Sequence, residues 1–313
     1  MMLASFLNPK TRVISTIVLV LLFAALPLIK VPGAWLLYIF LFFIYLSLAN
    51  MWNLLAGYSG LISLCQPAFI GLAGYTMVII TWNGLPYYWG IIVGGIVSGL
   101  FALLISTPVF RLSGIYFAIG TLVVPEALRV IFLLWRPIGG ALHGAGAGYR
   151  LKGLEALTMT ELYWMSLIIG VASIFIMRLI LRSSLGLGLA AIRDNASTAA
   201  SSGINVFKLK LFSFVVGAFV TGIAGSIFFI YQKYIEPTSA FNIRWTMILM
   251  LSAVIGGLGI ESGPIVGTVV VVFLHFFLAK YAGWSLLLQG VMLIFVMLLV
   301  PRGIMGFALK RTE

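Results

Sequence analysis

The stretch YWGIIVGGIVSGLFALLISTP, residues 88–108, contains no acidic or basic side chain. About 20 mostly apolar residues in a helix are enough to cross the hydrocarbon core of a bilayer, which is roughly 30 Å thick. The stretch therefore predicts a transmembrane helix. Its Gly95 and Gly99 are four residues apart, a spacing that lets helix backbones approach closely in lipid.

Similar apolar runs recur along the whole chain of 313 residues, of which 62% are hydrophobic and 8% are charged. A typical soluble domain has about 25% charged residues, so the composition indicates a polytopic membrane protein. No polar segment is longer than a loop, and we expect a single transmembrane domain over residues 1–313. The ten predicted segments lie near residues 13–29, 34–56, 62–81, 88–108, 113–134, 162–181, 209–231, 245–259, 265–281 and 285–300.

The expected fold class is therefore an all-α polytopic membrane protein with about ten transmembrane helices. Eight or nine remain possible, because the segments at 62–81 and 245–259 each adjoin a glycine-rich break. The first segment follows a basic start and lacks a small-residue cleavage site, so we expect an uncleaved helix. In an arrangement of ten spans, Lys and Arg are more frequent on the side of the membrane where the N-terminus lies. Many Trp and Tyr lie at the ends of the spans on the other side. Both termini are thus expected in the cytoplasm.

The formal net charge of +12 comes from basic residues spread in ones and twos. No basic run alternates with aromatic residues, so nucleic-acid binding is not indicated and the bilayer is the expected surrounding. No Gly-Lys pair occurs, which excludes a P-loop. His143 and His275 show no zinc-site spacing, and no G-x-S-x-G sequence occurs. We expect no catalytic site, metal site or cofactor on this chain.

Two apolar segments are interrupted by glycines and a proline: AGYSGLISLCQPAFIG at 56–71 and IGGLGIESGPIVG at 255–267. Non-helical backbone at membrane depth needs protein partners or a water-filled cavity. In transporters such breaks often line the substrate path; ordinary turns between helices are the alternative. The candidate pathway residues here are Asn53, Gln66, Pro67, Gly256, Gly257 and Gly259. For Asn53 and Gln66, an interhelical hydrogen bond is the simpler role.

Glu126 and Arg129 are the main ionisable residues inside a predicted span, in VVPEALRV. Charged side chains there are costly and usually face a partner or a hydrated cavity. Their spacing of three residues puts them on one helix face, where they can pair with each other. Glu126 is therefore either half of a structural ion pair or a further candidate pathway residue.

The polar stretch LGLAAIRDNASTAASSGIN, residues 187–205, lies in a predicted cytoplasmic loop over residues 182–208. Its alanines favour a helix, and Gly203 offers a stop. Arg193 and Asp194 can form directed polar contacts. From these residues alone, a solvated loop is the simpler interpretation, and a short helix that docks on another protein is the alternative.

Several segments carry a family resemblance: NLLAGYSGLISLCQPAFIGLAGY, FRLSGIYFAIGTLVVPEALR, RSSLGLGLAAIRDNASTAASSGIN, VIGGLGIESGPIVG and LVPRGIMG. The chain resembles the branched-chain amino acid ABC importer permeases of the LivM type, from about Asn53 to Gly306. The resemblance implies a multi-pass protein of a bacterial-type inner (plasma) membrane. It also implies a second, related permease, two ATPase subunits that hold ATP and Mg, and a periplasmic or extracellular substrate-binding protein.

The resemblance further implies that the polar stretch is a coupling helix, which transmits movement from the ATPases to the membrane spans. The expected coupling residues are Ala191, Ile192, Arg193, Asp194, Asn195, Ser197 and Gly203. Related permeases also serve urea and short amides, so these remain alternatives to leucine-like substrates. A self-contained secondary transporter or channel is the alternative class. A membrane-embedded enzyme is disfavoured by the absence of clustered acids, histidines or a nucleophile.

Overall fold

The computed structural model describes residues 21–29, 32–134, 145–278 and 303–310, together with residues 287, 288, 290, 291, 294, 295 and 298. Nearly all of the described chain is helical. The elements are η2 (Leu26–Ile29), α2 (Gly33–Asn53), the π-helical turn η3 (Leu54–Tyr58), α3 (Gln66–Trp82), α4 (Tyr87–Val109), α5 (Ile115–Leu134), η4 (Ala145–Ala147), β1 (Tyr149–Arg150), α6 (Met159–Arg182), α7 (Ser184–Asp194), α8 (Ala196–Ser201), α9 (Val206–Gln232), β2 (Tyr234–Ile235), α10 (Pro237–Ala240), α11 (Arg244–Gly256), α12 (Gly263–Leu278) and α14 (Gly303–Lys310).

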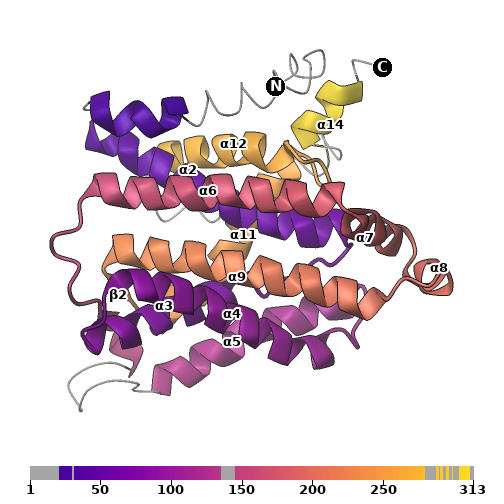
Figure 1. Cartoon of the computed structure of the whole chain (residues 1–313), viewed down its shortest axis with the longest axis horizontal. Coiled ribbons are helices and arrows are strands. Elements are labelled where there is room, and N and C mark those ends of the chain that lie inside the picture. The colour runs from indigo at the N-terminus through magenta and orange to yellow at the C-terminus, as the bar shows by residue number, and fades with distance from the viewer. Residues whose placement is uncertain are drawn as a thin grey trace.

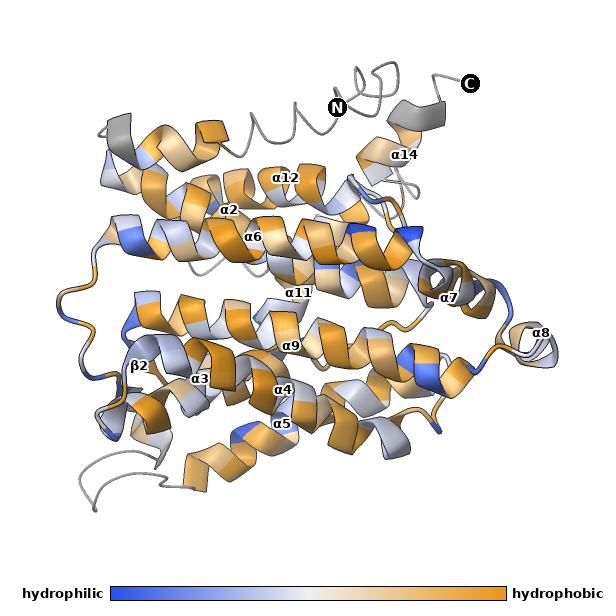
Figure 2. Cartoon of the chain, viewed as in Figure 1, coloured by the Kyte–Doolittle hydropathy of each residue, from blue (hydrophilic) through white to orange (hydrophobic). Residues whose placement is uncertain are grey.

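Six segments of the described chain are long and apolar enough to cross a membrane: Gly33–Tyr58, Tyr87–Val109, Ile115–Leu134, Met159–Arg182, Val206–Gln232 and Pro237–Gly256. The first five contain or closely match segments expected from the sequence, and Pro237–Gly256 overlaps the segment expected at 245–259 but begins earlier. The helix predicted over 88–108 is α4. Figure 2 shows hydrophobic residues along most of the helix surfaces and hydrophilic residues mainly near helix ends and in loops. The all-α, multi-pass character expected from the sequence is confirmed.

Helix α9 lies at the centre of the bundle, with α3 and α4 on one side and α2 and α6 on the other (Figure 1). α11 and α12 pack against each other and against α2. α5 is peripheral: 28% of the residues in its most apolar stretch are buried, against 78% for α9. The peripheral position leaves one face of α5 available for lipid, for another subunit or for a cavity.

Small residues allow the central helices to approach closely. A Cβ atom at Gly95 would lie 2.7 Å from Ile223 Cγ1, and a Cβ atom at Gly225 would lie 2.9 Å from Ile70 Cα. A larger side chain at either position would push α4 or α3 away from α9. The small-residue pairs Gly95–Gly99 and Thr221–Gly225 therefore serve packing within this bundle.

The two ends of the bundle differ (Figure 1). At one end β1 and β2 pair antiparallel, and the Trp82 indole N–H donates to the carbonyl of Arg150 at 2.9 Å. Lys152 Nζ lies 3.6 Å above the Trp82 ring, a favourable cation–π contact. Helices α7 and α8 lie at the opposite end. We call the β1–β2 pair the ribbon. The loop predicted over 182–208 is thus separated from the ribbon by the length of the membrane-spanning helices.

Two elements differ from the sequence prediction in extent. α3 begins at Gln66 rather than near residue 62, because the chain between Ser59 and Cys65 is not helical and Gly60 takes φ = 71°. α11 ends at Gly256 rather than near residue 259, because Gly257 takes φ = 120°. Both glycines adopt the positive-φ region that other residues avoid. The structure describes residues 21–29 of the predicted segment at 13–29 and only separate residues of the segment at 285–300, so neither is tested over its full length.

Candidate functional site

The two interrupted segments are in direct contact. Asn53, which is completely buried at the end of α2, accepts a hydrogen bond from Gly259 N–H at 2.9 Å. Its amide group donates to the carbonyl of Ile260 at 3.1 Å. One side chain thus satisfies a donor and an acceptor of the non-helical turn between α11 and α12, although the partners are about 200 residues apart in sequence.

Glycines make this contact close. A Cβ atom at Gly57, in the π-helical turn η3, would lie 2.5 Å from Gly259 N and would also clash with Asn53. The glycines of the α11–α12 turn and the glycine that begins α14 crowd one another in the same way. We call this set the glycine junction; its members are Gly57, Gly256, Gly257, Gly259, Gly263 and Gly303.

Side chains also support the first interruption. Trp52 donates its indole N–H to the carbonyl of Ser63 at 2.9 Å, and Thr121 of α5 accepts from Leu64 N–H at 3.0 Å. These bonds partner backbone groups that no helix satisfies, as a buried break in a membrane requires. The break is therefore supported by both α2 and α5.

Helix α7 reaches the glycine junction through Arg193. Arg193 Nη1 donates to the carbonyl of Gly57 at 3.0 Å, while Nε and Nη2 donate to Asp194 Oδ1 at 3.2 and 3.1 Å. A second ion pair joins Arg178, near the end of α6, to Glu261 in the α11–α12 turn. Helix α7, which forms the first part of the polar stretch, is thus joined to the first interrupted segment. Helix α6, which leads into the stretch, is joined to the second.

The polar stretch forms two helices, whereas the sequence suggested one. α7 ends at Asp194, and Asn195 begins α8 by accepting hydrogen bonds from the N–H groups of Ser197 at 3.0 Å and Thr198 at 3.2 Å. Gly203, at φ = 85°, follows α8 and stops it as expected.

The expected coupling residues divide by exposure. Ile192 is buried and Ala191 is half-buried, so these two face the protein. The side chains of Arg193, Asp194, Asn195 and Ser197 are exposed, and Gly203 is exposed as well. A contiguous polar surface at the α7–α8 boundary is therefore accessible to another protein.

We expect Asn195→Ala to loosen α8, because an N-cap side chain contributes about 1 kcal/mol to helix stability. Hydrogen exchange of the amides of residues 196–201 should become faster by about fivefold. The matched control is Ser201→Ala: Ser201 Oγ donates to the carbonyl of Ser197 and caps no free N–H. Equal exchange rates in the two variants would show that Asn195 does not hold α8.

A cavity of about 550 Å³ lies between α5, the start of α3 and the α10–α11 segment. Its apolar walls include Pro67, Phe241 and Ile243. Its lining residues are Leu64, Pro67, Leu122, Pro125, Glu126, Arg129, Thr238, Phe241, Asn242 and Ile243. We call it the α5 cavity. Its volume is within the range of cavities that hold small organic ligands.

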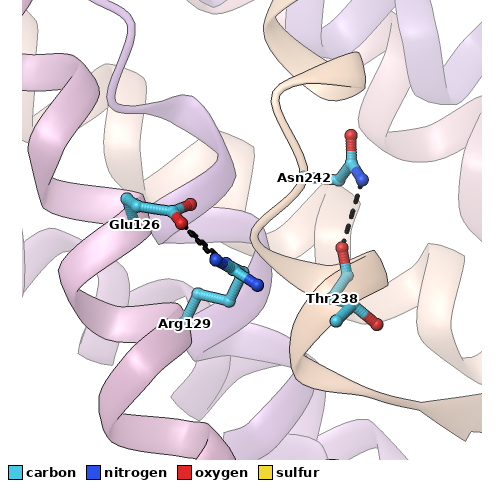
Figure 3. Close-up of polar contacts among 4 residues, drawn as sticks. All are labelled: Glu126, Arg129, Thr238 and Asn242. Atoms are coloured by element: carbon cyan, nitrogen blue, oxygen red, sulfur yellow. Dashed lines mark hydrogen bonds and ion pairs between the residues drawn. The ribbon is translucent and has the colours of Figure 1, made fainter.

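Charged and polar groups face each other across the α5 cavity (Figure 3). Arg129 Nε donates to Glu126 Oε1 at 3.0 Å on α5, and the Asn242 amide donates to the carbonyl of Thr238 at 3.2 Å on the other side. Glu126 is the more exposed partner of the ion pair, at 58%. The ion pair is therefore accessible from the cavity.

The α5 cavity gathers some of the candidate pathway residues but not all of them. Pro67 and Glu126 line it. Gln66 is buried next to Pro67 but does not line the cavity, and among the described residues its Oε1 has no hydrogen-bond partner. Asn53 and the glycines of the second interruption lie instead at the glycine junction.

Thr238 and Asn242 were not singled out from the sequence. They follow Pro237 in a stretch that reads as an outer loop, and neither is inside an apolar run. The available signal was a pair of polar residues shortly after a proline, Thr238 within α10 and Asn242 just beyond its end. Within the described ranges, no group of three or more His, Cys, Asp or Glu side chains is placed to hold a metal ion.

Comparison with known proteins supplies relatives along most of the chain. The high-affinity branched-chain amino acid transport system permease protein LivM of Salmonella typhimurium is 27% identical over 84% of this chain and 68% of its own length. The probable LivM permease of Methanocaldococcus jannaschii is 25% identical over 68% of this chain and 65% of its own. The ribose import permease protein RbsC of Haemophilus influenzae is 28% identical over 55% and 57%, respectively.

No solved structure matches the chain significantly. The sequence model of a protein family described as the permease component of a branched-chain amino acid transport system matches residues 35–300. This range contains both interrupted segments, the α5 cavity and the polar stretch of α7 and α8. The chain therefore belongs to the family of branched-chain amino acid transport system permease components.

Proposed function

We propose that the chain is the transmembrane permease subunit of an ATP-binding-cassette importer for branched-chain amino acids. A second, related permease completes the pathway, and two separate ATPase subunits bind ATP and Mg and supply the energy. A periplasmic or extracellular binding protein delivers the substrate. The chain itself binds no cofactor and catalyses no reaction; alternating access of the pathway is its contribution.

The observation that carries this proposal is the hydrogen bond from Arg193 to the carbonyl of Gly57. It connects an exposed helix pair at one end of the bundle to a break inside the membrane-spanning region. A displacement of α7 by a docked ATPase would therefore move the first interruption and, through Asn53, the second. This is the mechanical connection that an importer with a separate motor requires.

The proposed arrangement in the inner membrane has about ten crossings, an even number, with both termini in the cytoplasm. The polar stretch within residues 182–208 then faces the cytoplasm, where ATP is available, and its coupling residues are those named from the sequence. The ribbon of β1 and β2 faces the binding protein. Aromatic residues at the ribbon end and basic residues at the α7 end support this orientation.

The α5 cavity is the proposed part of the substrate pathway. An amino acid carries an ammonium group and a carboxylate, and Glu126 and Arg129 offer the two complementary charges side by side. The apolar walls suit an aliphatic side chain. Urea and short amides carry no formal charge and would form no ion pairs with Glu126 and Arg129. The two charged side chains in the cavity therefore favour amino acids over urea or short amides as substrates.

The direct test is uptake by the complete complex in vesicles. We expect ATP-dependent uptake of labelled leucine, with competition by isoleucine and valine and none by urea. Competition by urea alone would support the short-amide alternative. Uptake by the chain in the absence of ATPase subunits would contradict the proposal and indicate a secondary transporter or channel.

The role of the ion pair can be separated from a structural one. We expect Glu126→Gln to reduce leucine uptake about tenfold, because loss of one charged hydrogen bond to the substrate costs about 1.5 kcal/mol or more. The matched control is Glu155→Gln, since Glu155 is exposed near the ribbon. The double variant Glu126→Arg/Arg129→Glu keeps the pair and exchanges its ends. Normal uptake by this double variant would show that the pair is structural.

A further inference from the structure

A second, smaller cavity of about 120 Å³ lies at the α7 end of the bundle. It is bounded by the end of α7, the first interruption, the α4–α5 connection and the first turns of α9. Its lining residues are Ser59, Gly60, Leu61, Leu112, Ser113, Gly114, Phe117, Ile192, Arg193 and Lys210. It is too small for a whole nucleotide or drug-sized ligand and suits a single small polar group.

The charge of this cavity is positive. Arg193 and Lys210 line it, and none of its lining residues is acidic. Arg193 is held in place by its bonds to Gly57 and Asp194. Lys210 is half-buried, and within the described part of the chain no carboxylate or hydrogen-bond acceptor is recorded for its ammonium group. A cation that is partly withdrawn from water and has no partner is unfavourable, and an anion in the cavity would compensate it.

The surface beside the cavity is apolar. Leu112, which also lines the cavity, is 40% exposed, and Ile115 and Tyr116, at the start of α5, are 77% and 74% exposed. Phe207, one turn before Lys210 on α9, is 46% exposed. A positively charged cavity next to exposed apolar side chains at a helix end matches an amphiphile, whose headgroup is anionic and whose tail is apolar.

We propose that this cavity binds the headgroup phosphate of an anionic phospholipid from the leaflet that faces α7, with Arg193 and Lys210 donating to the phosphate oxygens. The acyl chains lie along Ile115, Tyr116 and Phe207. Basic cavities between transmembrane helices on the cytoplasmic side are suited to such headgroups. Because Arg193 also bonds to Gly57, a bound lipid would stabilise the contact between α7 and the glycine junction.

The test measures lipid binding by the purified chain in detergent, using native mass spectrometry and a titration with phosphatidylglycerol. We expect one phosphatidylglycerol to bind more tightly than phosphatidylcholine. Lys210→Met should weaken phosphatidylglycerol binding about fivefold, the contribution of one basic residue near a membrane surface. Lys210→Arg should restore it, because the positive charge returns.

The matched control is Lys208→Met, the same change two residues earlier on α9, at an exposed lysine that does not line the cavity. Equal binding by the Lys208 and Lys210 variants would overturn the proposal. Equal binding of phosphatidylcholine and phosphatidylglycerol by the unaltered chain would also overturn it, and this comparison needs no variant to fold. Binding of inorganic phosphate without retention of the lipid would assign the cavity to a soluble anion instead.

Discussion

Replacing Arg193 by alanine should reduce ATP-dependent uptake at least tenfold while the chain still inserts and assembles. The variant loses the hydrogen bond from the guanidinium to the carbonyl of Gly57, and a hydrogen bond of a charged group contributes about 1.5–3 kcal/mol. Without this bond, α7 can move without displacing the first interruption. The measurements are leucine uptake and binding-protein-stimulated ATPase activity of the complete complex in proteoliposomes.

Two further variants sharpen this experiment. Arg193→Lys keeps the positive charge but loses the planar guanidinium, which donates to Gly57 and to Asp194 at the same time. Uptake by this variant should therefore be intermediate. Lys208→Ala removes an exposed basic residue from the start of α9 and should leave uptake near normal. If Arg193→Ala transported like Lys208→Ala, the bond to Gly57 would not be the coupling contact.

Substitution of Asp194 and Asn195 by bulky residues addresses the exposed side of the same helices. Asp194 is 70% exposed, so a large apolar side chain there would not disturb the interior of the chain. It would disturb a docked ATPase. Asp194 also accepts hydrogen bonds from Arg193, and Asn195 caps α8. Loss of uptake in this variant would therefore support a coupling role of the polar stretch as a whole, and normal uptake would contradict it.

The membrane-spanning helices could be predicted from the sequence because apolar length alone determines them. The run at 162–181 corresponds to α6 and the run at 209–231 to α9, each within three residues of the structure at both ends. In lipid, a long apolar helix satisfies its own backbone groups and has no competing structure. The same reasoning fails at glycine-rich breaks, where the helix limits of α3 and α11 depend on single residues, Gly60 and Gly257.

The site was less predictable, because its contacts join distant parts of the chain. Asn53 and Gly259 were both singled out as polar or glycine-rich interruptions, yet nothing local indicates that they bond to each other. The break between α7 and α8 had a local signal, since Asn195 is a favourable N-cap residue. The alanines on both sides of Asn195 favour helix as well, and they suggested one continuous element.

Gly57→Ala should disrupt the glycine junction and abolish transport. A Cβ atom at residue 57 would lie 2.8 Å from Gly259 Cα and would clash with the Asn53 side chain that joins the two interruptions. Overpacking of this kind costs about 1–3 kcal/mol, and here the neighbours are backbone atoms and a bonded amide that cannot rotate away freely. We expect a lower thermal unfolding midpoint in detergent and at least a tenfold loss of uptake.

The matched control is Gly217→Ala on α9, which also faces η3. A Cβ atom at Gly217 would lie 3.6 Å from Leu55 Cδ1, an ordinary van der Waals contact, and alanine favours helix over glycine by about 1 kcal/mol. This variant should keep its stability and its uptake. Because both changes add one methyl group near the same turn, a shared effect would be due to added volume in general. An effect confined to residue 57 would locate the transmission of movement at the contact between the two interruptions, and equal, normal behaviour of both variants would contradict it.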